Sequence, residues 1–569
     1  MKYLRLKKRG MMPCIILLAI FMSLFAQSEN ENRIFQTNLH YEEGDWISYS
    51  EHRFINTIAI GNEFVYFATN GGIIRYNYFS NKWDFPWTRS NGLASNTIIV
   101  VAFDENTNFL WCSTPLGVSY YQPGQKIWAN TYKDEIGIRT FDDVRSIGFD
   151  TKTVWLITMN GQIFRGDNQM GMFAQVFEEP GNSGNIKWFG QRGWQRIQLT
   201  PLFMPDGYLF DTRGYIQDIE LRTFDVSYYV LDRWGFMWFG TDGLGATRAD
   251  IRTDRMELMP YGLMQQNVTA IAKKEDQFWI GGWDEMYHDH NYGEESGITR
   301  WDIRHNEWTH YQAKYITDFD NDQVTSIAVD GDTIWFGTEQ GLVRFIPDEN
   351  EWRTFDQSNR LRSNYIFDVV VNDQYVWVAT PSGIDRIYKY GIKKDSLNIT
   401  WIARDDLREL DVYDLEFMDD ILWAGTEFGA YYYDTLKDSG GFFEKGVLGP
   451  GTKRVYAVSW GGDEVWFGTS DGVEVYDLNE EKWCPTPKRR INMTHRINFI
   501  RVNDQVAWVG TDQGAWKYDL ERNYWKLFTI EDGLVHNTVQ AILIDGDYVW
   551  FSTPQGLTKF YWNNPFRID

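Results

Sequence analysis

The sequence predicts an all-β protein, a β-propeller with about twelve four-stranded blades in two consecutive rings. Three observations predict this fold. A Trp-x-Gly-Thr motif recurs along the chain, its copies are evenly spaced, and short alternating apolar runs ending at tight-turn residues surround each copy. A chain of 569 residues is also too long for one ordinary hydrophobic core, which favours several packed units.

Even spacing is the strongest of these observations. Trp335 and Trp550 are five repeats apart, which gives a mean spacing of 43 residues. A four-stranded propeller blade takes about 40 to 45 residues. With a degenerate copy, YLFDTRG, included, the twelve aromatic anchors are Tyr66, Trp111, Trp155, Tyr208, Trp238, Trp279, Trp335, Trp377, Trp423, Trp466, Trp508 and Trp550.

Each repeat contains signals for four strands. In VTSIAVDGDTIWFGT two apolar runs meet at Asp330-Gly331-Asp332, residues that tolerate the positive φ of a tight hairpin. Gly341 then fits a second turn, and GLVRF is the third strand. Trp352 marks the outer fourth strand.

We interpret the Trp-x-Gly-Thr motif as structural. Large aromatic side chains fill the space between neighbouring sheets, while glycine and threonine allow close approach of the backbone. The repeat therefore accounts for the 27 tryptophans without any ligand.

Residues 1–26 are expected to be an export signal. MKYLRLKKRGMM supplies positive charge, CIILLAIFMSLFA is an apolar run of thirteen residues, and cleavage is expected after Ala26. The run is shorter than the ~20 residues that span a bilayer, and the residues around Cys14 do not fit a lipoprotein site. We expect a periplasmic or secreted chain that begins near Gln27, with a lead-in over 27–45 and no membrane insertion after the signal is removed.

The net charge limits the partners. The chain carries a formal charge of -24, and loss of five basic residues with the signal makes it about -29. Such a surface repels nucleic acid and anionic lipid, so neither is expected as a partner. Cys112 and Cys484 are too few to form a disulfide framework and are expected to be buried free thiols.

Twelve repeats exceed the 4 to 8 blades usual for one ring, so the sequence predicts two rings. We expect a first propeller of about six blades over residues 46–311 and a second of about six over 312–569. Seven plus five blades, or one very large ring, are the alternatives. The chain begins with a fourth-type strand, DWISYS, and ends on a third-type strand, GLTKFYW, so a ring can close by pairing an entering outer strand with three strands of its last repeat.

Several repeats carry a more specific resemblance. The stretches GLASNTIIVVAFDENTNFLWCST, RLRSNYIFDVVVNDQYVWVAT and GLVHNTVQAILIDGDYVWFSTPQGLTKF resemble the two-component regulator propeller repeat, and the similarity covers nearly the whole mature chain from about Trp46. That repeat is best known from extracytoplasmic sensor regions of hybrid two-component systems in Bacteroidetes, where it senses polysaccharide breakdown products.

The resemblance has two functional implications. It implies a glycan fragment as one class of ligand. Twin propellers of this repeat are also similar to surface proteins that assist protein secretion in such bacteria. The sensors continue into a sandwich domain, a membrane helix, a kinase and a regulator, whereas this sequence ends at GLTKFYWNNPFRID, so we expect that it does not signal across a membrane alone.

Function is expected where the repeats break, and the clearest break is GGWDEMYHDHNYGEESG at residues 281–297. Its aromatic residues could stack on a sugar ring, and its histidines, His288 and His290, could hold a metal, although no third ligand stands at a fixed spacing. A solvated loop would explain the same composition. The candidate ligand-binding residues here are Trp283, Asp284, Glu285, Tyr287, His288, His290 and Tyr292.

A second irregular run covers residues 178–198. Trp188 and Trp194 are its candidate contact residues, and the eroded outer part of a degenerate blade is the structural alternative.

Enzyme motifs are thin in the sequence, which has no Gly-x-x-x-x-Gly-Lys and no His-Glu-x-x-His. We therefore expect a non-catalytic binding or scaffold protein, without a cofactor or catalytic residues, that engages a partner protein or a glycan fragment at a ring face. The partner protein is preferred. A propeller-fold polysaccharide lyase or glycosidase with its site near His288 is the alternative.

Overall fold

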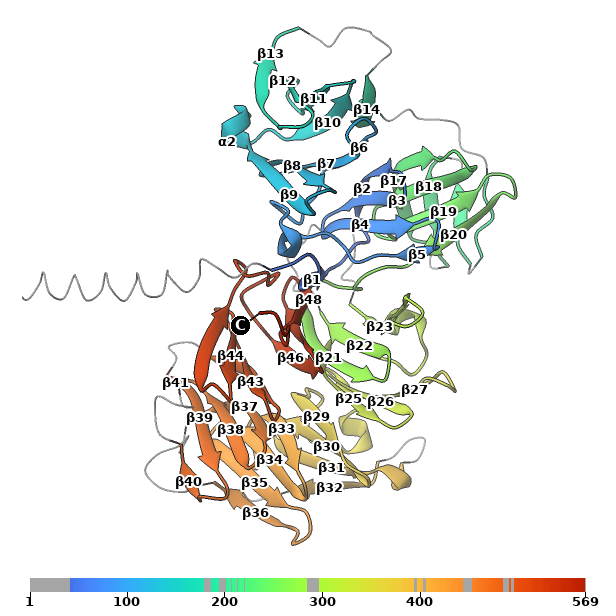
Figure 1. Cartoon of the computed structure of the whole chain (residues 1–569). Helices are drawn as coiled ribbons and strands as arrows, with labels where there is room; N and C mark the ends of the chain where they lie inside the picture. The colour runs from blue at the N-terminus through green and yellow to red at the C-terminus, as the bar shows by residue number, and fades with distance from the viewer. Residues whose placement is uncertain are drawn as a thin grey trace, which may run out of the picture. The chain divides into compact units, whose positions relative to one another are not determined.

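The computed structural model is an all-β protein whose antiparallel sheets follow one another along the chain (Figure 1). The structure describes residues 41–178, 186–193, 201–205, 207–211, 213–219, 221–283, 296–392, 397–402, 406–443, 453–484, 491–492 and 496–567. These residues contain eleven sheets, where the sequence predicts about twelve. Residues 43–561, which include every sheet, form one compact unit.

Four sheets, which we call the N-terminal sheets, come first after β1 (Trp46–Tyr49). Their strands are β2 (Ile55–Ile60), β3 (Phe64–Thr69), β4 (Gly72–Asn77) and β5 (Lys82–Trp83); β6 (Val100–Asp104), β7 (Phe109–Thr114), β8 (Gly117–Gln122) and β9 (Ile127–Tyr132); β10 (Val144–Phe149), β11 (Thr153–Thr158), β12 (Ile163–Asp167), β13 (Phe173–Val176) and β14 (Lys187–Gly190); and β15 (Leu209–Asp211), β16 (Tyr215–Gln217), β17 (Thr223–Leu231), β18 (Phe236–Thr241), β19 (Ala246–Asp250) and β20 (Arg255–Met259). One short helix, α2 (Lys133–Ile136), follows β9.

Seven further sheets, the C-terminal sheets, include β1 as a member of the last one. Their other strands are β21 (Val268–Lys274), β22 (Gln277–Gly282), β23 (Ile298–Asp302) and β24 (Glu307–Tyr311); β25 (Val324–Asp330), β26 (Thr333–Thr338), β27 (Gly341–Ile346) and β28 (Glu351–Phe355); β29 (Asp368–Val371), β30 (Tyr375–Thr380), β31 (Gly383–Tyr388) and β32 (Ile399–Ile402); β33 (Val412–Met418), β34 (Ile421–Thr426), β35 (Gly429–Asp434) and β36 (Ser439–Phe442); β37 (Val455–Gly461), β38 (Glu464–Thr469), β39 (Gly472–Asp477), β40 (Lys482–Trp483) and β41 (Ile491–Asn492); β42 (Ile497–Val502), β43 (Val506–Thr511), β44 (Ala515–Asp519) and β45 (Tyr524–Phe528); and β46 (Ala541–Asp545), β47 (Tyr548–Thr553) and β48 (Gly556–Tyr561). Single 3-10 turns lie at Arg89–Asn91, Ala313–Tyr315, Gln357–Asn359 and Lys389–Gly391.

The Trp-x-Gly-Thr motif ends the second strand of each regular sheet, and each of its residues has a packing role. Trp335 is 1 % exposed. A Cβ on Gly337 would lie 2.7 Å from Cγ2 of Ile366 in the next sheet, so only glycine allows this approach. Thr338 Oγ1 donates to the carbonyl of Gly341 (2.8 Å), which has a φ of 143°. These contacts support the structural interpretation of the motif.

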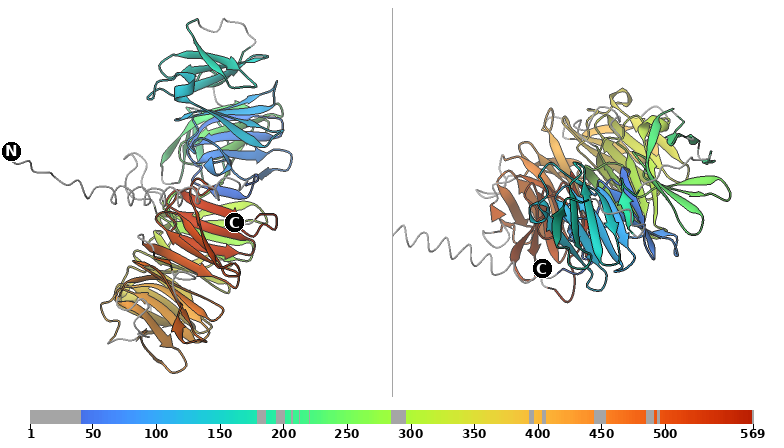
Figure 2. Two further views of the ribbon diagram at one scale, coloured as in Figure 1. Left: turned by 60° about the vertical axis from the view of Figure 1, so that its left-hand side comes forward. Right: turned by 90° about the horizontal axis from the view of Figure 1, so that it is seen from above.

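The innermost strands of the C-terminal sheets lie against one another in a closed series. β21 lies against β25, the contacts continue through β29, β33, β37, β42 and β46, and β46 lies against β21. Successive sheets in this series stand side by side in two views (Figures 1 and 2). The antiparallel four-stranded sheets and their closed order are consistent with a propeller.

β1 belongs to this series although it comes from the start of the chain. It pairs antiparallel with β48, with Trp46 opposite Phe560 and Tyr49 opposite Leu557. The indole of Trp46 stacks on the ring of Phe560, with the ring centroids 3.8 Å apart. The entering strand therefore completes the sheet formed by the last three strands of the chain and covers the edge of β48.

Two sets of contacts join segments on either side of residue 311, where the sequence predicts a division into two rings. β1 and the sheet of β21 to β24 pack with the C-terminal sheets, whereas the expected first ring covered residues 46–311. The N-terminal sheets are inserted between β1 and β21. The entering strand pairs with the last repeat of the chain.

The degenerate repeat at Tyr208 also differs from expectation. Its strands β15 and β16 join the sheet of β17 to β20, so among the described residues it does not form a sheet of its own. β14 pairs with β10 on the inner side of its sheet and lies against β6 and β2. This extra strand fills the space beside the innermost strands of the N-terminal sheets.

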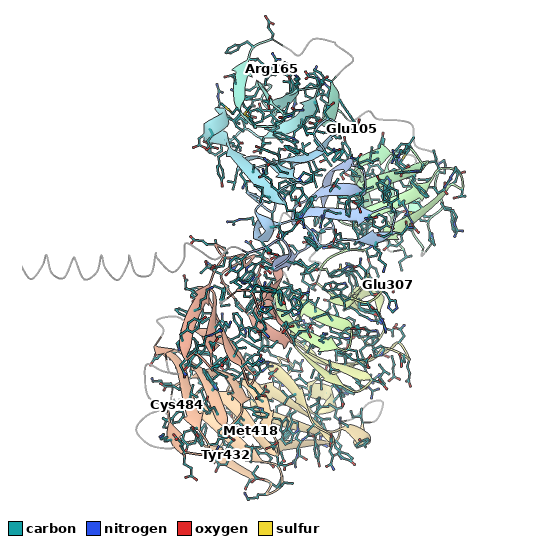
Figure 3. All side chains as sticks on the ribbon, in the orientation of Figure 1. Glu105, Arg165, Glu307, Met418, Tyr432 and Cys484 are labelled. Atoms are coloured by element: carbon teal, nitrogen blue, oxygen red, sulfur yellow. The ribbon has the colours of Figure 1, made fainter. Side chains whose placement is uncertain are left out.

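Side chains fill the spaces between neighbouring sheets (Figure 3). Cys112 is fully buried and Cys484, which follows β40, is 9 % exposed. Both are free thiols, as the sequence predicts. Burial raises the pKa of both thiols, which keeps them protonated and unreactive at neutral pH.

Candidate functional site

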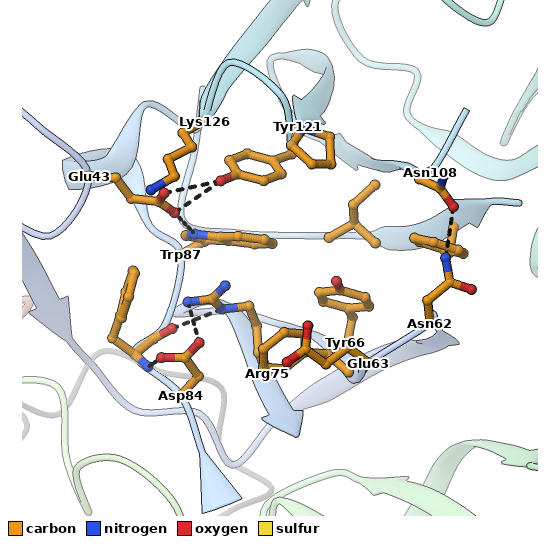
Figure 4. Close-up of a pocket in the computed structure, with 15 residues that line it drawn as sticks. Glu43, Asn62, Glu63, Tyr66, Arg75, Asp84, Trp87, Asn108, Tyr121 and Lys126 are labelled. Carbon is orange, nitrogen blue, oxygen red and sulfur yellow. Dashed lines mark hydrogen bonds and ion pairs between the residues drawn. The ribbon is translucent and has the colours of Figure 1, made fainter. Parts of the chain in front are cut away.

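The described part of the chain contains hollows that are large enough to hold a ligand, and two of them lie among the sheets. The first, which we call the Arg75 pocket, has a volume of about 520 Å³ and lies between the sheets of β2 to β5 and β6 to β9 (Figure 4). Arg75 Nη2 pairs with Asp84 (3.0 Å), and its guanidinium carbon lies 3.9 Å from the ring centroid of Trp87. Glu43 accepts hydrogen bonds from Trp87 Nε1 (3.2 Å) and from the hydroxyl of Tyr121 (3.1 Å).

The Arg75 pocket is a variation of a feature that the repeats share. Arg75 stands opposite the anchor Tyr66 on the neighbouring strand, as Arg386 stands opposite Trp377. The guanidinium of Arg386 lies 5.5 Å from the ring of Trp377. A cation over the anchor aromatic also occurs at Arg248 and Trp238, whereas the guanidinium of Arg75 lies over Trp87 instead of its anchor. The polar groups of the pocket pair with one another, so a structural role explains Arg75 and Glu43.

The second hollow is the central channel of the C-terminal sheets, with a volume of about 430 Å³. Each of the seven C-terminal sheets contributes one residue to the lining of this channel at the end where the innermost strands begin. This residue belongs to the innermost strand or directly precedes it. In five sheets the register shifts there and leaves one residue in a β-bulge. The seven bulge positions are Thr269, Thr325, Phe367, Tyr413, Tyr456, Asn498 and Gln540.

Phe367 and Gln540 occupy the position equivalent to the bulge residue, as their backbone hydrogen bonds show. The amide of Phe367 donates to the carbonyl of Ala379, and the amide of Gln540 donates to that of Ser552. Both residues directly precede the first paired residue of their strand, as Tyr413 precedes Asp414. All seven side chains are therefore placed by the same local backbone geometry.

Four of the seven bulge side chains connect their sheet to the next one. Thr269 Oγ1 donates to the carbonyl of Val324, and Thr325 Oγ1 to that of Ile366 (2.7 Å). Asn498 Nδ2 donates in the same way to the carbonyl of Val539 (3.0 Å). Gln540 Nε2 donates to Oδ1 of Asn267, which precedes β21 (2.7 Å).

The other three bulge residues are aromatic and lie on consecutive sheets. The ring centroids of Phe367 and Tyr413 are 5.3 Å apart with the planes at 68°, and those of Tyr413 and Tyr456 are also 5.3 Å apart, at 40°. All three side chains are half-buried. Tyr365 extends the row, and the guanidinium carbon of Arg496 lies 4.2 Å from the ring centroid of Tyr456 at its other end. We call Phe367, Tyr413 and Tyr456 the aromatic arc.

Charged groups lie deeper in the channel. Asp368 accepts hydrogen bonds from Ser326 Oγ (2.6 Å) and the Leu415 amide (2.9 Å). Glu416 and Arg501, from strands two sheets apart, form an ion pair at 2.8 Å.

Asp414 lies next to these groups and is 7 % exposed. It accepts a hydrogen bond from the Val458 amide (2.6 Å). Burial, helped by the charge of Asp368, raises the pKa of its carboxyl well above the usual range. Asp368 and Asp414 thus connect neighbouring innermost strands, and a structural role explains them.

The sequence-predicted site residues are only partly described. Trp188 lies on β14, where its ring contacts the backbone of Gly148 and the guanidinium of Arg192. Trp283 directly follows β22 and is half-buried. The structure does not bring these two tryptophans together with each other or with the aromatic arc. Asp284, Glu285, Tyr287, His288, His290, Tyr292 and Trp194 lie outside the described residues.

Metal and membrane sites can be assessed only for the described residues. Within them, no three His, Cys, Asp or Glu side chains are grouped so that they could hold a metal ion. Within the same residues, no helix has the length and apolar character needed to cross a bilayer. His288 and His290, the predicted metal candidates, are outside this part of the chain.

Comparison with known proteins supports the fold. No family model matches the chain, and no curated protein matches it. The structure of PorZ, named as an essential bacterial surface component of the type-IX secretion system of Porphyromonas gingivalis, has a TM-score of 0.54 and 13% identity, with 91% of this chain and 87% of that chain covered. The similarity shows a shared fold.

Two further structures come from B. thetaiotaomicron and are named as extracellular domains of hybrid two-component systems. BT4673 has a TM-score of 0.43 and 14% identity, with 90% of this chain and 70% of that chain covered. BT3049 has a TM-score of 0.39 and 14% identity, with 92% and 76% covered.

Proposed function

We propose that this chain is an exported, non-catalytic propeller protein that binds a partner protein or a glycan fragment at a ring face. The observation that carries the proposal is the aromatic arc at the mouth of the central channel, because half-buried aromatic rings at a hollow are typical of binding sites and the fold does not require them there. Residues 1–26 are proposed as the cleaved signal, which places the chain in the periplasm or outside the cell.

The proposal includes the arrangement of the blades. We propose that the C-terminal sheets form one ring of seven blades closed by β1, and that the N-terminal sheets form a smaller, irregular unit inserted between β1 and β21. The channel of the seven-blade ring is open, whereas β14 lies against the innermost strands of the N-terminal sheets. The ring with the open channel is therefore the better candidate for binding.

PorZ supports a surface role by analogy, because a protein of this fold is named as a surface component of a secretion system. The insertion expected from the sequence at residues 281–297 adds support of another kind. It follows β22, whose last residue Gly282 pairs with Val268 at the start of β21, and the innermost strands begin at the channel mouth. Trp283 thus lies at the face that carries the aromatic arc.

The test uses the mature chain from Gln27. We would measure thermal shifts with a panel of oligosaccharides, and quantify proteins captured from the native envelope against a control chain. A saturable shift or a specifically captured protein supports binding. If neither occurs, the binding proposal is wrong. A product released from any oligosaccharide would also contradict it, because the chain would then be an enzyme.

A further inference from the structure

The central channel of the C-terminal sheets carries more acidic than basic side chains. Asp368, Asp414 and Glu416 are acidic, and Arg501 is the only basic side chain among the described residues that line it. Glu416 pairs with Arg501 at 2.8 Å. Neither Asp368 nor Asp414 forms an ion pair with a described residue. Because buried carboxylates need a compensating positive charge, the channel is short of one cation.

In the free chain a proton on Asp414 supplies this positive charge. Burial and the charge of Asp368 raise the pKa of the Asp414 carboxyl well above its usual range. The residue is 7 % exposed, and its Oδ2 accepts the hydrogen bond from the Val458 amide. No donor of a described residue bonds Oδ1, although Asp414 lines the channel. The contact with Val458 explains one oxygen, and the other is left for a donor that enters the channel.

An organic cation fits these groups better than a metal ion. Within the described residues no three acidic, histidine or cysteine side chains are close enough together to hold a metal. The mouth of the channel instead presents the aromatic arc, and aromatic faces attract ammonium and guanidinium groups. The hydroxyl of Tyr413 also donates to Asp411 (3.1 Å), which adds a carboxylate beside the arc.

The chain itself shows how a basic side chain packs on the arc. Arg496, which is exposed and directly precedes β42, places its guanidinium carbon 4.2 Å from the ring centroid of Tyr456. Among the described residues, no basic side chain lies over the ring of Phe367 or Tyr413. Arg454, just before β37, pairs with Glu427 at 3.0 Å. Two rings of the arc are therefore accessible to a further cation.

The order of groups along the channel matches a lysine or arginine side chain. The rings lie at the mouth and the carboxylates lie deeper. Lysine and arginine have an aliphatic stem, which packs on apolar surface, and a charged head. The volume of about 430 Å³ admits such a side chain and excludes a folded domain. The net charge of -24 also attracts a partner protein with a basic surface.

We propose that the channel receives a lysine or arginine side chain of a partner protein, with its stem on Phe367 and Tyr413 and its charged head at Asp414. This inference rests on the proposed binding function and names the group that the site recognises. The head donates to Oδ1 of Asp414, while Glu416 and Arg501 stay paired with each other.

Binding of the cation is coupled to a proton. The groups that face the Asp414 carboxyl are Asp368 of β29, Glu416 of its own strand, Arg501 of β42 and the Val458 amide of β37. A positive charge placed beside this carboxyl favours its ionised form, so Asp414 gives its proton to water when the cation binds. The affinity should therefore rise with pH until Asp414 is already ionised in the free chain.

The test selects binders from a displayed library of random dodecapeptides on the mature full-length chain. We expect enriched peptides that share a lysine or an arginine. Synthetic peptides in which norleucine replaces the shared lysine, or citrulline the shared arginine, keep the stem and lose the charge, so they should bind at least tenfold more weakly. Calorimetry of the parent peptide in two buffers of different ionisation enthalpy should show the release of a proton.

Two variants separate the carboxylate from the rings. Asp414→Asn keeps the size of the side chain and an acceptor for the Val458 amide. It should weaken the peptides at least tenfold and abolish the proton release. Tyr413→Thr introduces the residue that two other bulges use and should weaken them about fivefold. The matched control, Asp373→Asn, changes an exposed carboxylate in the turn between β29 and β30 and should leave binding unchanged.

The proposal is overturned if the enriched peptides share no basic residue, if the uncharged peptides bind as the parent does, or if Asp414→Asn binds the parent as the wild type does. Saturable binding of spermidine without any enriched peptide would make the channel a site for a free amine and would also overturn it. If the envelope partner of the wild type is captured equally by Asp414→Asn and Tyr413→Thr, the docking proposal is wrong while the proposed binding function stands.

Discussion

Trp46 gives the sharpest test of the inserted arrangement of the N-terminal sheets. It lies on β1, is 2 % exposed, and stacks on Phe560 of β48. A buried tryptophan removes about 200 Å² of surface from water, worth about 5 kcal/mol at ~25 cal/mol per Å². Alanine retains a small part of this, so Trp46→Ala should cost the local structure about 3–5 kcal/mol.

Hydrogen exchange with mass spectrometry can show which residues lose stability in Trp46→Ala. A local cost of about 3–5 kcal/mol corresponds to exchange that is about a hundred to several thousand times faster in the affected amides. We expect this acceleration in peptides from residues 541–561, which are almost 500 residues away in sequence. Trp111→Ala, a fully buried tryptophan on β7, is the matched control and should accelerate residues 100–132 instead. Unchanged exchange over 541–561 in Trp46→Ala, or a loss confined to 55–83, would refute the pairing of β1 with the last sheet.

Three further predictions concern buried groups, each measured by chemical denaturation. Arg362→Ala leaves the carboxylate of Asp385 buried without its ion-pair partner, because this carboxylate is fully buried and lies 3.2 Å from the guanidinium. The variant should lower the free energy of unfolding by about 3–5 kcal/mol. Adding Asp385→Asn should recover most of this loss, and a double variant that is as unstable as Arg362→Ala would contradict the reasoning. Burial lowers the pKa of His52 to about 3 from 6.5, so the folded chain should lose stability as the pH falls below about 6.5, by about 2 kcal/mol at pH 5; His52→Gln should remove that part of the pH dependence, and an unchanged slope would show that His52 does not contribute. Gly337→Ala places a Cβ 2.7 Å from the side chain of Ile366 and should lower the free energy of unfolding by about 1–3 kcal/mol. Gly124→Ala is the control, because a Cβ there meets nothing within 4 Å, and it should change the free energy of unfolding by less than about 0.5 kcal/mol. Equal effects of the two substitutions would contradict the close-approach argument.

The sheets could be predicted from the sequence because the residues that determine each sheet lie within one repeat. The anchor tryptophan, the Asp-Gly turn and the glycine after Thr338 act within about twenty residues and do not depend on the rest of the chain. The division into sets of sheets could not be predicted in the same way. A fourth-type strand such as Trp46–Tyr49 can complete any sheet that lacks one, and the choice is made by contacts distant in sequence.

The degenerate repeat shows a second limit. YLFDTRG keeps the spacing of an anchor but lacks the tryptophan and the small residue that let neighbouring sheets pack closely. Its strands, β15 and β16, pair with β17 instead of forming a separate sheet. Spacing alone is therefore insufficient to predict a blade when the residues that pack between sheets have changed.

The aromatic arc is visible in an alignment of the repeats, although the search for breaks in the repeat does not find it. When the repeats are aligned on their first strands, Val-Thr-Ser at Thr325 corresponds to Ile-Phe-Asp at Phe367, Val-Tyr-Asp at Tyr413 and Val-Tyr-Ala at Tyr456. The middle residue is polar in the other C-terminal repeats and aromatic in these three. A search for breaks in the repeat finds insertions such as residues 281–297 and misses substitutions that keep the spacing.

Site-specific photo-crosslinking in the native envelope tests the binding site most directly. A benzoylphenylalanine would replace Phe367, and Tyr390, which is 76 % exposed and lies in the 3-10 turn after β31, would carry the same probe as the control. The account predicts a covalent adduct of one defined mass from position 367 that is absent from position 390. No adduct at 367, or the same adducts at both positions, would contradict binding at the mouth of the channel.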